Sequence, residues 1–232
     1  MKTLYVFGDS FSDPNHSWYA AGEYFWIKDL EKKFTIHNFS IKGSSPYYQL
    51  QRLIDIIDTT DAEKLKQSNM IFFMSHITRP NFKFLEPNDH YLTWHIMKPD
   101  PNCEKSKLAE KYSKYKNFLH EYNNYDGIDL NSKIIMCYST IYTLSKFFNK
   151  TLLWPCFNDI PYSAQTHYDR NFDCVMTPLI EISNNENYPD NKKNMHLHLE
   201  NHKIMERELY NWMTKNIKIN IKNFIRNIND KT

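Results

Sequence analysis

The sequence predicts an α/β domain, a three-layer sandwich of about five parallel strands with helices on both faces. Short apolar runs rich in β-branched and aromatic residues alternate along the chain with segments whose apolar residues recur every three or four positions. Strands that alternate with helices form a parallel sheet, because each helix returns the chain to the edge where the next strand begins. The 232 residues, 41% of them hydrophobic, fit a single domain over 1–232 with one sizeable insertion.

The expected strands are short apolar runs, at residues 3–7, 34–41, 70–74, 151–155 and 175–182. The expected helices have one apolar side, at residues 23–33, 46–57, 104–122, 130–149 and 199–228. The second helix has a clear start, because Gly43 supplies a loop and Pro46 suits a first helical turn. The last helix extends into a helical tail at about 217–232, which packs either onto its own domain or onto a second copy of the chain in a homo-oligomer.

An insertion at about 80–125 separates the third strand from the fourth. It is too long for a plain connection and is rich in aromatic residues, so we expect it to be ordered. We also expect it to lie near the carboxyl ends of the strands, where ligands bind to sheets of this kind. Its aromatic side chains include Tyr91, Trp94 and His95. They either form a platform for a sugar ring or pack the insertion onto the domain, and the sequence leaves both interpretations open.

Charge and cysteine content exclude several classes of protein. With 29 Lys and Arg against 27 Asp and Glu, the net charge is only +2, which argues against a nucleic-acid binder with a broad basic surface. The four cysteines include no C-x-x-C pair, so we expect reduced thiols and neither a zinc ribbon nor a disulfide framework. We find neither a signal peptide nor a membrane span, and expect a soluble protein that is cytoplasmic if it is cellular.

The most specific motif is Gly8-Asp9-Ser10, at the end of the first expected strand. A serine in a strand-to-helix turn has its hydroxyl at the open edge of the sheet and its amide pointing into the same crevice. One residue can then supply both a nucleophile and an oxyanion donor. Taken alone, the motif is as compatible with a serine that caps the following helix.

A histidine near the other end of the chain supplies a base. His196 lies just before the last amphipathic helix, and from a loop there it is expected to reach over the sheet edge to Ser10 and accept its proton. The alternative for any one of the ten histidines is a plain surface residue.

These motifs resemble those of the SGNH or GDSL hydrolases, a family of esterases and acylhydrolases with a flavodoxin-like sheet. Gly8-Asp9-Ser10 matches the nucleophile block of that family, so the resemblance implies that Ser10 is the nucleophile. Gly43 matches the glycine after the second strand whose amide faces the oxyanion. His196 and Leu197, with Asn201 and His202 five and six positions after His196, match the last block and imply that His196 is the base.

The match departs from the family pattern in two blocks, and is closest to divergent phage and bacterial members. The Gly-x-Asn-Asp block after the third strand is absent, and Thr78 stands at the position of its oxyanion asparagine. Either the Thr78 hydroxyl or the His76 ring then replaces that donor. The triad acid usually lies three residues before the histidine, where this chain has Lys193; Asp190 is the nearest carboxylate. The resemblance covers roughly residues 1–78 and 152–212.

The resemblance implies a serine esterase that cleaves an acyl or acetyl ester, of a carbohydrate or another small molecule, without a cofactor. Two alternatives stay open. The scaffold has lost turnover and serves as a binding or structural module, or the protein is a metallohydrolase. The second rests on His196, His198 and His202, which have the spacing of metal ligands, with help from Asp9 or Asp13.

Overall fold

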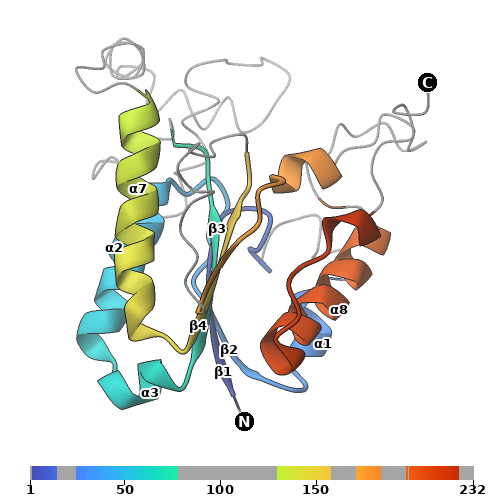
Figure 1. Ribbon diagram of the computed structural model, residues 1–232, viewed down its shortest axis with the longest axis horizontal. Coiled ribbons are helices and arrows are strands. Elements are labelled where there is room, and N and C mark those ends of the chain that lie inside the picture. The colour runs from blue at the N-terminus through green and yellow to red at the C-terminus, as the bar shows by residue number, and fades with distance from the viewer. Residues whose placement is uncertain are drawn as a thin grey trace, which may run out of the picture.

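The computed structural model describes residues 2–14, 25–77, 130–157, 171–183, 197 and 199–224. Within these ranges five strands form one sheet in the order β2-β1-β3-β4-β5, and each neighbouring pair is parallel (Figure 1). The strands are β1 Thr3–Phe7, β2 Thr35–Asn38, β3 Asn69–Met74, β4 Lys150–Pro155 and β5 Phe172–Cys174. The predicted α/β class is confirmed, and the strand order is the flavodoxin-like one.

Helices connect and cover the strands. The α-helices are α1 Ile27–Leu30, α2 Pro46–Thr59, α3 Ala62–Lys66, α7 Leu130–Leu144 and α8 Leu199–Lys215. Short 3₁₀ segments are η3 Ser145–Phe147, η5 Leu179–Ile182 and η6 Ile221–Asn223. Helix α2 starts as the sequence predicts, because the Ser45 hydroxyl accepts a hydrogen bond from the Tyr48 amide and Pro46 occupies the first turn.

Alternate residues of each central strand enter two separate apolar cores. On one face Val6, Phe73 and Trp154 pack with α1 and α8. On the other face Phe7 and Phe72 pack with α2 and α7. Figure 1 shows this division, with α2, α3 and α7 on one side of the sheet and α1 and α8 on the other. The sheet is therefore buried on both faces, and its carboxyl edge is the place where polar loops gather.

The connections from β1 to β2 and from β2 to β3 lie on opposite faces of the sheet. Helix α1, between β1 and β2, packs on one face, while α2, between β2 and β3, packs on the other. In open α/β sheets a crevice forms beyond the carboxyl ends of the strands at such a switch point, here between β1 and β3. Ser10 follows β1 and His76 follows β3, so both lie at this point of the sheet.

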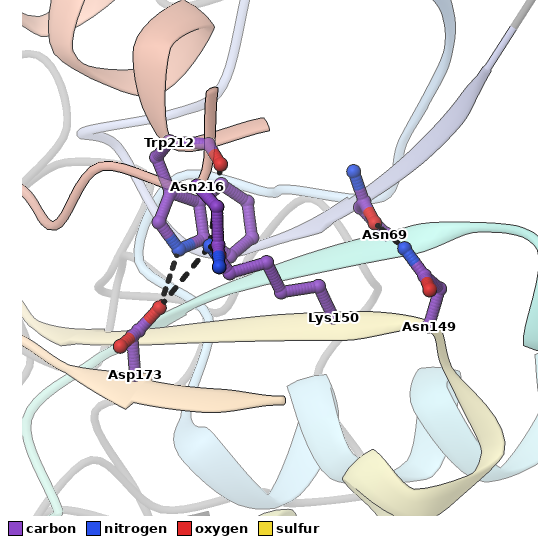
Figure 2. A network of polar contacts seen from close by, with 6 residues as sticks. All are labelled: Asn69, Asn149, Lys150, Asp173, Trp212 and Asn216. Atoms are coloured by element: carbon purple, nitrogen blue, oxygen red, sulfur yellow. Dashed lines mark hydrogen bonds and ion pairs between the residues drawn. The ribbon is translucent and has the colours of Figure 1, made fainter. Parts of the chain in front are cut away.

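A polar cluster closes the opposite, amino-terminal edge of the sheet (Figure 2). The Lys150 ammonium donates to the Trp212 carbonyl at 3.2 Å and to Asn216 Oδ1 at 2.7 Å. It also lies 3.4 Å from Asp173 Oδ2, which accepts a hydrogen bond from the Trp212 indole at 2.7 Å. Burial lowers the pKa of Lys150, and Asp173 opposes part of that shift. The cluster joins the start of β4, strand β5 and the end of α8.

Several predicted elements differ from the structure. The helix predicted over 23–33 is an α-helix only over Ile27–Leu30 among its described residues, and helix α3 was not predicted. The fifth strand is Phe172–Cys174, whereas the region predicted as a strand, 175–182, contains the 3₁₀ helix η5. Pro178 directly precedes η5 with an extended backbone and has no amide hydrogen to donate to a neighbouring strand. The expected helix over 199–228 ends at Lys215, where Asn216 takes a left-handed backbone conformation with φ 56°.

The segment that follows Asn216 packs onto its own domain as far as Phe224. The Phe224 ring meets the Trp154 ring edge-on at 5.7 Å, and the Asn220 amide donates to the buried carboxylate of Glu208 at 3.0 Å. The insertion at about 80–125, the expected helix at 104–122 and the tail beyond 224 lie outside the described residues. Among the described helices, none has both the length and the apolar character that a membrane crossing requires.

Candidate active site at the carboxyl edge of the sheet

The Ser10 turn directly follows β1. The Ser12 amide donates to the Asp9 carbonyl at 3.0 Å, and the Phe11 amide donates to Asp9 Oδ1 at 3.1 Å. The second contact is an Asx turn, in which a side chain replaces a backbone carbonyl as the acceptor. Ser10 lies at the centre of both turns and is half-buried. Within the described part of the chain, no residue forms a hydrogen bond with its hydroxyl or its amide.

Gly8 allows this turn to pack closely on the sheet. A Cβ atom at this position would lie 2.0 Å from Ser12 Oγ, 3.0 Å from Phe73 Cβ and 3.2 Å from Ser40 Oγ. The first distance is too short for a real Cβ atom and the other two are tight, and Phe73 cannot move away without disturbing the core. A glycine is therefore needed before Asp9.

A second turn, over residues 41–44, follows β2. The Ser44 amide donates to the Ile41 carbonyl at 3.0 Å, and Gly43 has a φ of 74°. A positive φ at the third position of a four-residue turn is the conformation of a type II turn, which favours glycine. The family resemblance predicts that Gly43 is an oxyanion donor; the structure shows its backbone conformation and leaves that role a prediction.

Besides a contact of the Ser44 hydroxyl with the Gly8 carbonyl, three hydrogen bonds join the segments that contain the two turns, residues 8–13 and 38–44. The Ile41 amide donates to the Gly8 carbonyl at 3.2 Å, and the Lys42 amide donates to the carboxylate of buried Asp13 at 2.9 Å. In the third, the Asn38 side chain donates to the Ser12 carbonyl at 2.7 Å. The structure therefore brings Ser10 and Gly43 to the same edge of the sheet, on turns that are bonded to each other.

The Asp9 carboxylate is fully buried and connects three strand ends. Its Oδ2 accepts a hydrogen bond from the Ser75 hydroxyl at 3.0 Å, directly after β3. Its Oδ1 accepts from the Cys156 thiol at 3.5 Å, directly after β4. From the sequence, Asp9 is predicted only as a member of the Gly8-Asp9-Ser10 motif and as a helper to a metal, and Ser75 has no predicted role. Polar residues that directly follow two buried strands were the signal for this contact.

His76 is also at this edge, and it is half-buried. The centroid of its ring lies 5.4 Å from that of the Phe157 ring. The Phe157 ring in turn meets the Phe11 ring edge-on, with 6.0 Å between the two centroids. His76 is thus connected to the Ser10 turn through one aromatic side chain. Thr78, the other residue predicted to replace the oxyanion asparagine, lies outside the described residues.

The predicted base and acid, His196 and Asp190, also lie outside the described residues. Leu197 is described, and its side chain is buried in the core cluster that contains Phe11. Near the start of α8 the Asn201 side chain donates to the Ile182 carbonyl at 2.6 Å. These contacts hold the chain around the start of α8 against the core.

The metal-site alternative depends on three histidines, of which only His202 is described. Its side chain is 2% exposed, and its ring lies 5.7 Å from the Phe25 ring inside the core. Asp9 and Asp13 accept the hydrogen bonds given above. In the described ranges, no three His, Cys, Asp or Glu side chains gather as metal ligands would.

The sequence matches no protein-family model and no curated protein. Several solved structures are similar in fold. A psychrotrophic esterase, EstA from Pseudoalteromonas sp., has 13% sequence identity and a TM-score of 0.47, over 93% of this chain and 98% of that one. TesA has 15% identity and a TM-score of 0.42, over 93% and 100% of the two chains. Axe2, an acetylxylan esterase from Geobacillus stearothermophilus, has 11% identity and a TM-score of 0.34, over 90% and 71%. At these values no residue role is transferred, and the fold assignment rests on the strand order.

Proposed function

We propose that the protein is a serine ester hydrolase that cleaves an acyl or acetyl ester of a carbohydrate or another small alcohol. Ser10 is the nucleophile in this proposal, His196 the base, and Asp190 the carboxylate that orients the base. The observation that carries the proposal is the half-buried Ser10 at the switch point of a parallel sheet, on a turn bonded to the Gly43 turn.

The reaction proceeds in two displacements. His196 accepts the hydroxyl proton as Ser10 Oγ attacks the ester carbonyl, and the negative charge that forms on the carbonyl oxygen is bound by the amides of Ser10 and Gly43. Thr78 or His76 supplies the remaining donor. The C–O bond to the alcohol breaks, the alcohol leaves with the proton from His196, and Ser10 holds the acyl group. A water molecule, deprotonated by His196, then attacks the acyl carbonyl; the C–O bond to Ser10 Oγ breaks, His196 returns the proton to Ser10 Oγ, and the acid leaves.

Two features of the described chain support these roles. Within those residues, no hydrogen bond engages the Ser10 hydroxyl or amide, so both groups can interact with a substrate. Leu197, the sequence neighbour of His196, is packed in the same core cluster as Phe11, the sequence neighbour of Ser10. The base and the nucleophile are thus each one residue from a side chain of one common cluster.

The test combines turnover with covalent labelling. We expect the parent protein to hydrolyse p-nitrophenyl acetate and to be labelled on Ser10 by a fluorophosphonate. Ser10→Ala should remove the label and lower turnover by about 10³-fold or more. Ser139→Ala, on the exposed side of α7, is the control and should behave like the parent. Label on another residue, or Ser10→Ala with the parent's turnover, would contradict the proposal. A parent without turnover or label would favour a binding or structural module.

A further inference from the structure

We propose that Gln49 and Ser75 are positioning residues for the oxyanion site, acting through a closed ring of buried hydrogen bonds that fixes the Ser10 turn relative to the Gly43 turn. This role rests on the proposed ester hydrolysis. The ring consists of Gly8, Asp9, Ser44, Gln49 and Ser75, and we call it the Gln49 ring.

Each contact of the Gln49 ring joins two different segments. The Ser44 hydroxyl donates to the Gly8 carbonyl at 2.9 Å, and the Gln49 side-chain amide donates to the Ser44 hydroxyl at 3.2 Å. The Ser75 amide donates to Gln49 Oε1 at 3.4 Å, and the Ser75 hydroxyl donates to Asp9 Oδ2 at 3.0 Å. The peptide bond between Gly8 and Asp9 closes the ring. It therefore passes through the nucleophile turn, the residue after Gly43, helix α2 and the end of β3.

The members of the Gln49 ring are buried, so each side chain is held in one position by its hydrogen bonds. Asp9, Ser44 and Ser75 are 0% exposed and Gln49 is 2% exposed. A buried polar group that loses its partner cannot turn to bulk water, so a displacement of one member leaves a donor or acceptor unsatisfied. Gln49 also breaks the expected pattern of its helix, because it shares the buried side of α2 with Pro46, Leu50 and Leu53. A glutamine at that position has a polar role inside the fold.

The ring connects the two backbone segments that carry the proposed oxyanion donors. Gly8 and Asp9 directly precede Ser10, and Ser44 directly follows Gly43. Donors of an oxyanion site are effective only when they are fixed before the reaction, and a misplacement near 1 Å can cost about 10²-fold in rate. Gln49 and Ser75 do not need to touch the substrate to control this rate.

The experiment uses Ser75→Ala and Gln49→Met, which remove one and two side-chain hydrogen bonds of the ring. Ser68→Ala is the matched control, since Ser68 directly precedes β3, is 1% exposed, and donates to the Lys64 carbonyl at 2.7 Å at the other edge of the sheet. Circular dichroism and a urea titration confirm that each variant is folded at the assay temperature.

Two readouts decide the proposal. In the ¹H–¹⁵N spectrum of the full chain, we expect Ser75→Ala and Gln49→Met each to shift the amide signals of both Ser10 and Gly43, whereas Ser68→Ala leaves them in place. With p-nitrophenyl acetate we expect kcat to fall by about 10- to 100-fold while KM changes by less than about 3-fold. The shift of the Gly43 signal in Ser75→Ala is the sharpest expectation, since these two residues lie on different segments that the ring connects.

The outcomes separate the ring from the esterase proposal. Unshifted Ser10 and Gly43 amides would overturn the ring whether or not the parent turns over substrate. Shifted amides with an unchanged kcat would overturn the positioning role while leaving Ser10 as the nucleophile. A parent that lacks turnover and label removes the proposed function and with it the catalytic role of the ring, and the amide signals still decide whether the ring couples the two turns.

Discussion

Each residue of the Gly8-Asp9-Ser10 motif has a separate physical reason. Gly8 is needed because a side chain would enter the space of Ser12 and Phe73. Asp9 is needed as a buried acceptor for the Phe11 amide and the Ser75 hydroxyl. Ser10 is the one member whose side chain remains half-exposed at the edge of the sheet. The two residues before the serine support the turn, and the serine side chain lies at the open edge of the sheet.

The pH dependence of the reaction tests the proposed base. Because a protonated imidazole cannot accept the Ser10 proton, we expect kcat/KM to rise through a pKa near the ordinary histidine value of about 6.5 and to level above it. Below that pKa the rate should fall about tenfold per pH unit. Steady-state hydrolysis of p-nitrophenyl acetate between pH 5 and 8 measures this profile.

A variant of the base gives the matching control. His196→Gln should lower kcat/KM strongly and remove the rise near pH 6.5, whereas His37→Gln should keep the parent's profile, since His37 is a half-buried residue in β2 that stacks on Tyr5. A parent rate that is flat from pH 5 to 8 would rule out a histidine base.

At the level of elements, the polar contacts of Lys150 with Asp173, Trp212 and Asn216, here called the Lys150 cluster, fasten the last helix to the sheet (Figure 2). The Lys150 ammonium contacts three acceptors. These are the Trp212 carbonyl on α8, the Asp173 carboxylate on β5 and the side chain of Asn216, directly after α8. The ammonium also lies over the Trp212 ring, 4.7 Å from the centroid. The end of α8 is therefore held at the amino edge of the sheet, while its start lies toward the carboxyl edge.

Replacement of Lys150 by methionine tests this role. Lys150→Met removes a charged donor from buried acceptors and leaves Asp173 with the Trp212 indole, so we expect the free energy of unfolding to fall by about 2 to 4 kcal/mol. Lys146→Met is the control, because Lys146 is exposed and contacts the Tyr142 ring; it should change stability by less than about 0.5 kcal/mol. Urea titrations at pH 7 measure both variants.

The difference in the free energy of unfolding between the parent and Lys150→Met should also depend on pH. Burial lowers the pKa of Lys150 below its ordinary value of 10.5, so between those two values the unfolded chain binds more protons than the folded one. The parent should therefore gain stability relative to Lys150→Met as the pH rises toward 10.5, and lose that gain as the pH falls through the lowered pKa. Equal stability of parent and Lys150→Met at pH 7 would show that the cluster does not fasten α8.

At the level of the whole molecule, the thiols report on global opening. Cys137 and Cys156 are buried, and burial, with a contribution from Asp173, raises the pKa of Cys174 to about 12. At pH 8 a shift from 9.0 to about 12 reduces the reactive thiolate by about a thousandfold. In a Cys103→Ser background, we expect iodoacetamide to modify the three thiols of the native protein slowly and together, at a rate that follows unfolding in urea.

The control for this experiment is the same protein in 8 M urea, where all three thiols should react at once. Rapid modification of one thiol in the native protein would show a local opening at that strand or helix, and the described packing of that residue would be wrong.

The sequence predicted most of the sheet because local pattern and tertiary burial agree there. Strands β1, β3 and β4 each contain an unbroken apolar run, at residues 4–7, 70–74 and 152–155, and α2 has a cap, a proline and an apolar side. Strand β5 was misplaced, because it is only three residues long and contains Asp173, whereas the more apolar 175–182 forms η5. The tail pattern continued past Lys215 because Ile221 and Phe224 still pack on the core after the chain reverses at Asn216.

Part of the candidate site could likewise be predicted from the sequence and part could not. Ser10 and Gly43 could be identified because strand ends and glycine turns are local features, and the structure places both at one edge. The Gln49 ring could not, since its hydrogen bonds join residues far apart in sequence and only the folded chain shows which pairs meet. The chemical roles of the site residues, the single domain, the homo-oligomer and the lack of nucleic-acid binding stay predictions. The site residues concerned are Ser10, His196, Asp190, Gly43, Thr78 and His76.

The pairing of β4 beside β3 also affects how the chain is synthesised. Strand β4 is the neighbour of β3 in the sheet, yet residues 75–149 lie between them. At ordinary translation rates, the ribosome needs roughly 4 to 16 s to progress from the end of β3 to the end of β4. During that interval the edge of β3 that faces β4 has no strand from its own nascent polypeptide to pair with, whereas its other edge can pair with β1. Because an unpaired strand edge is prone to aggregation, we expect this stretch to be the point of biosynthesis at which the growing protein depends most on a chaperone.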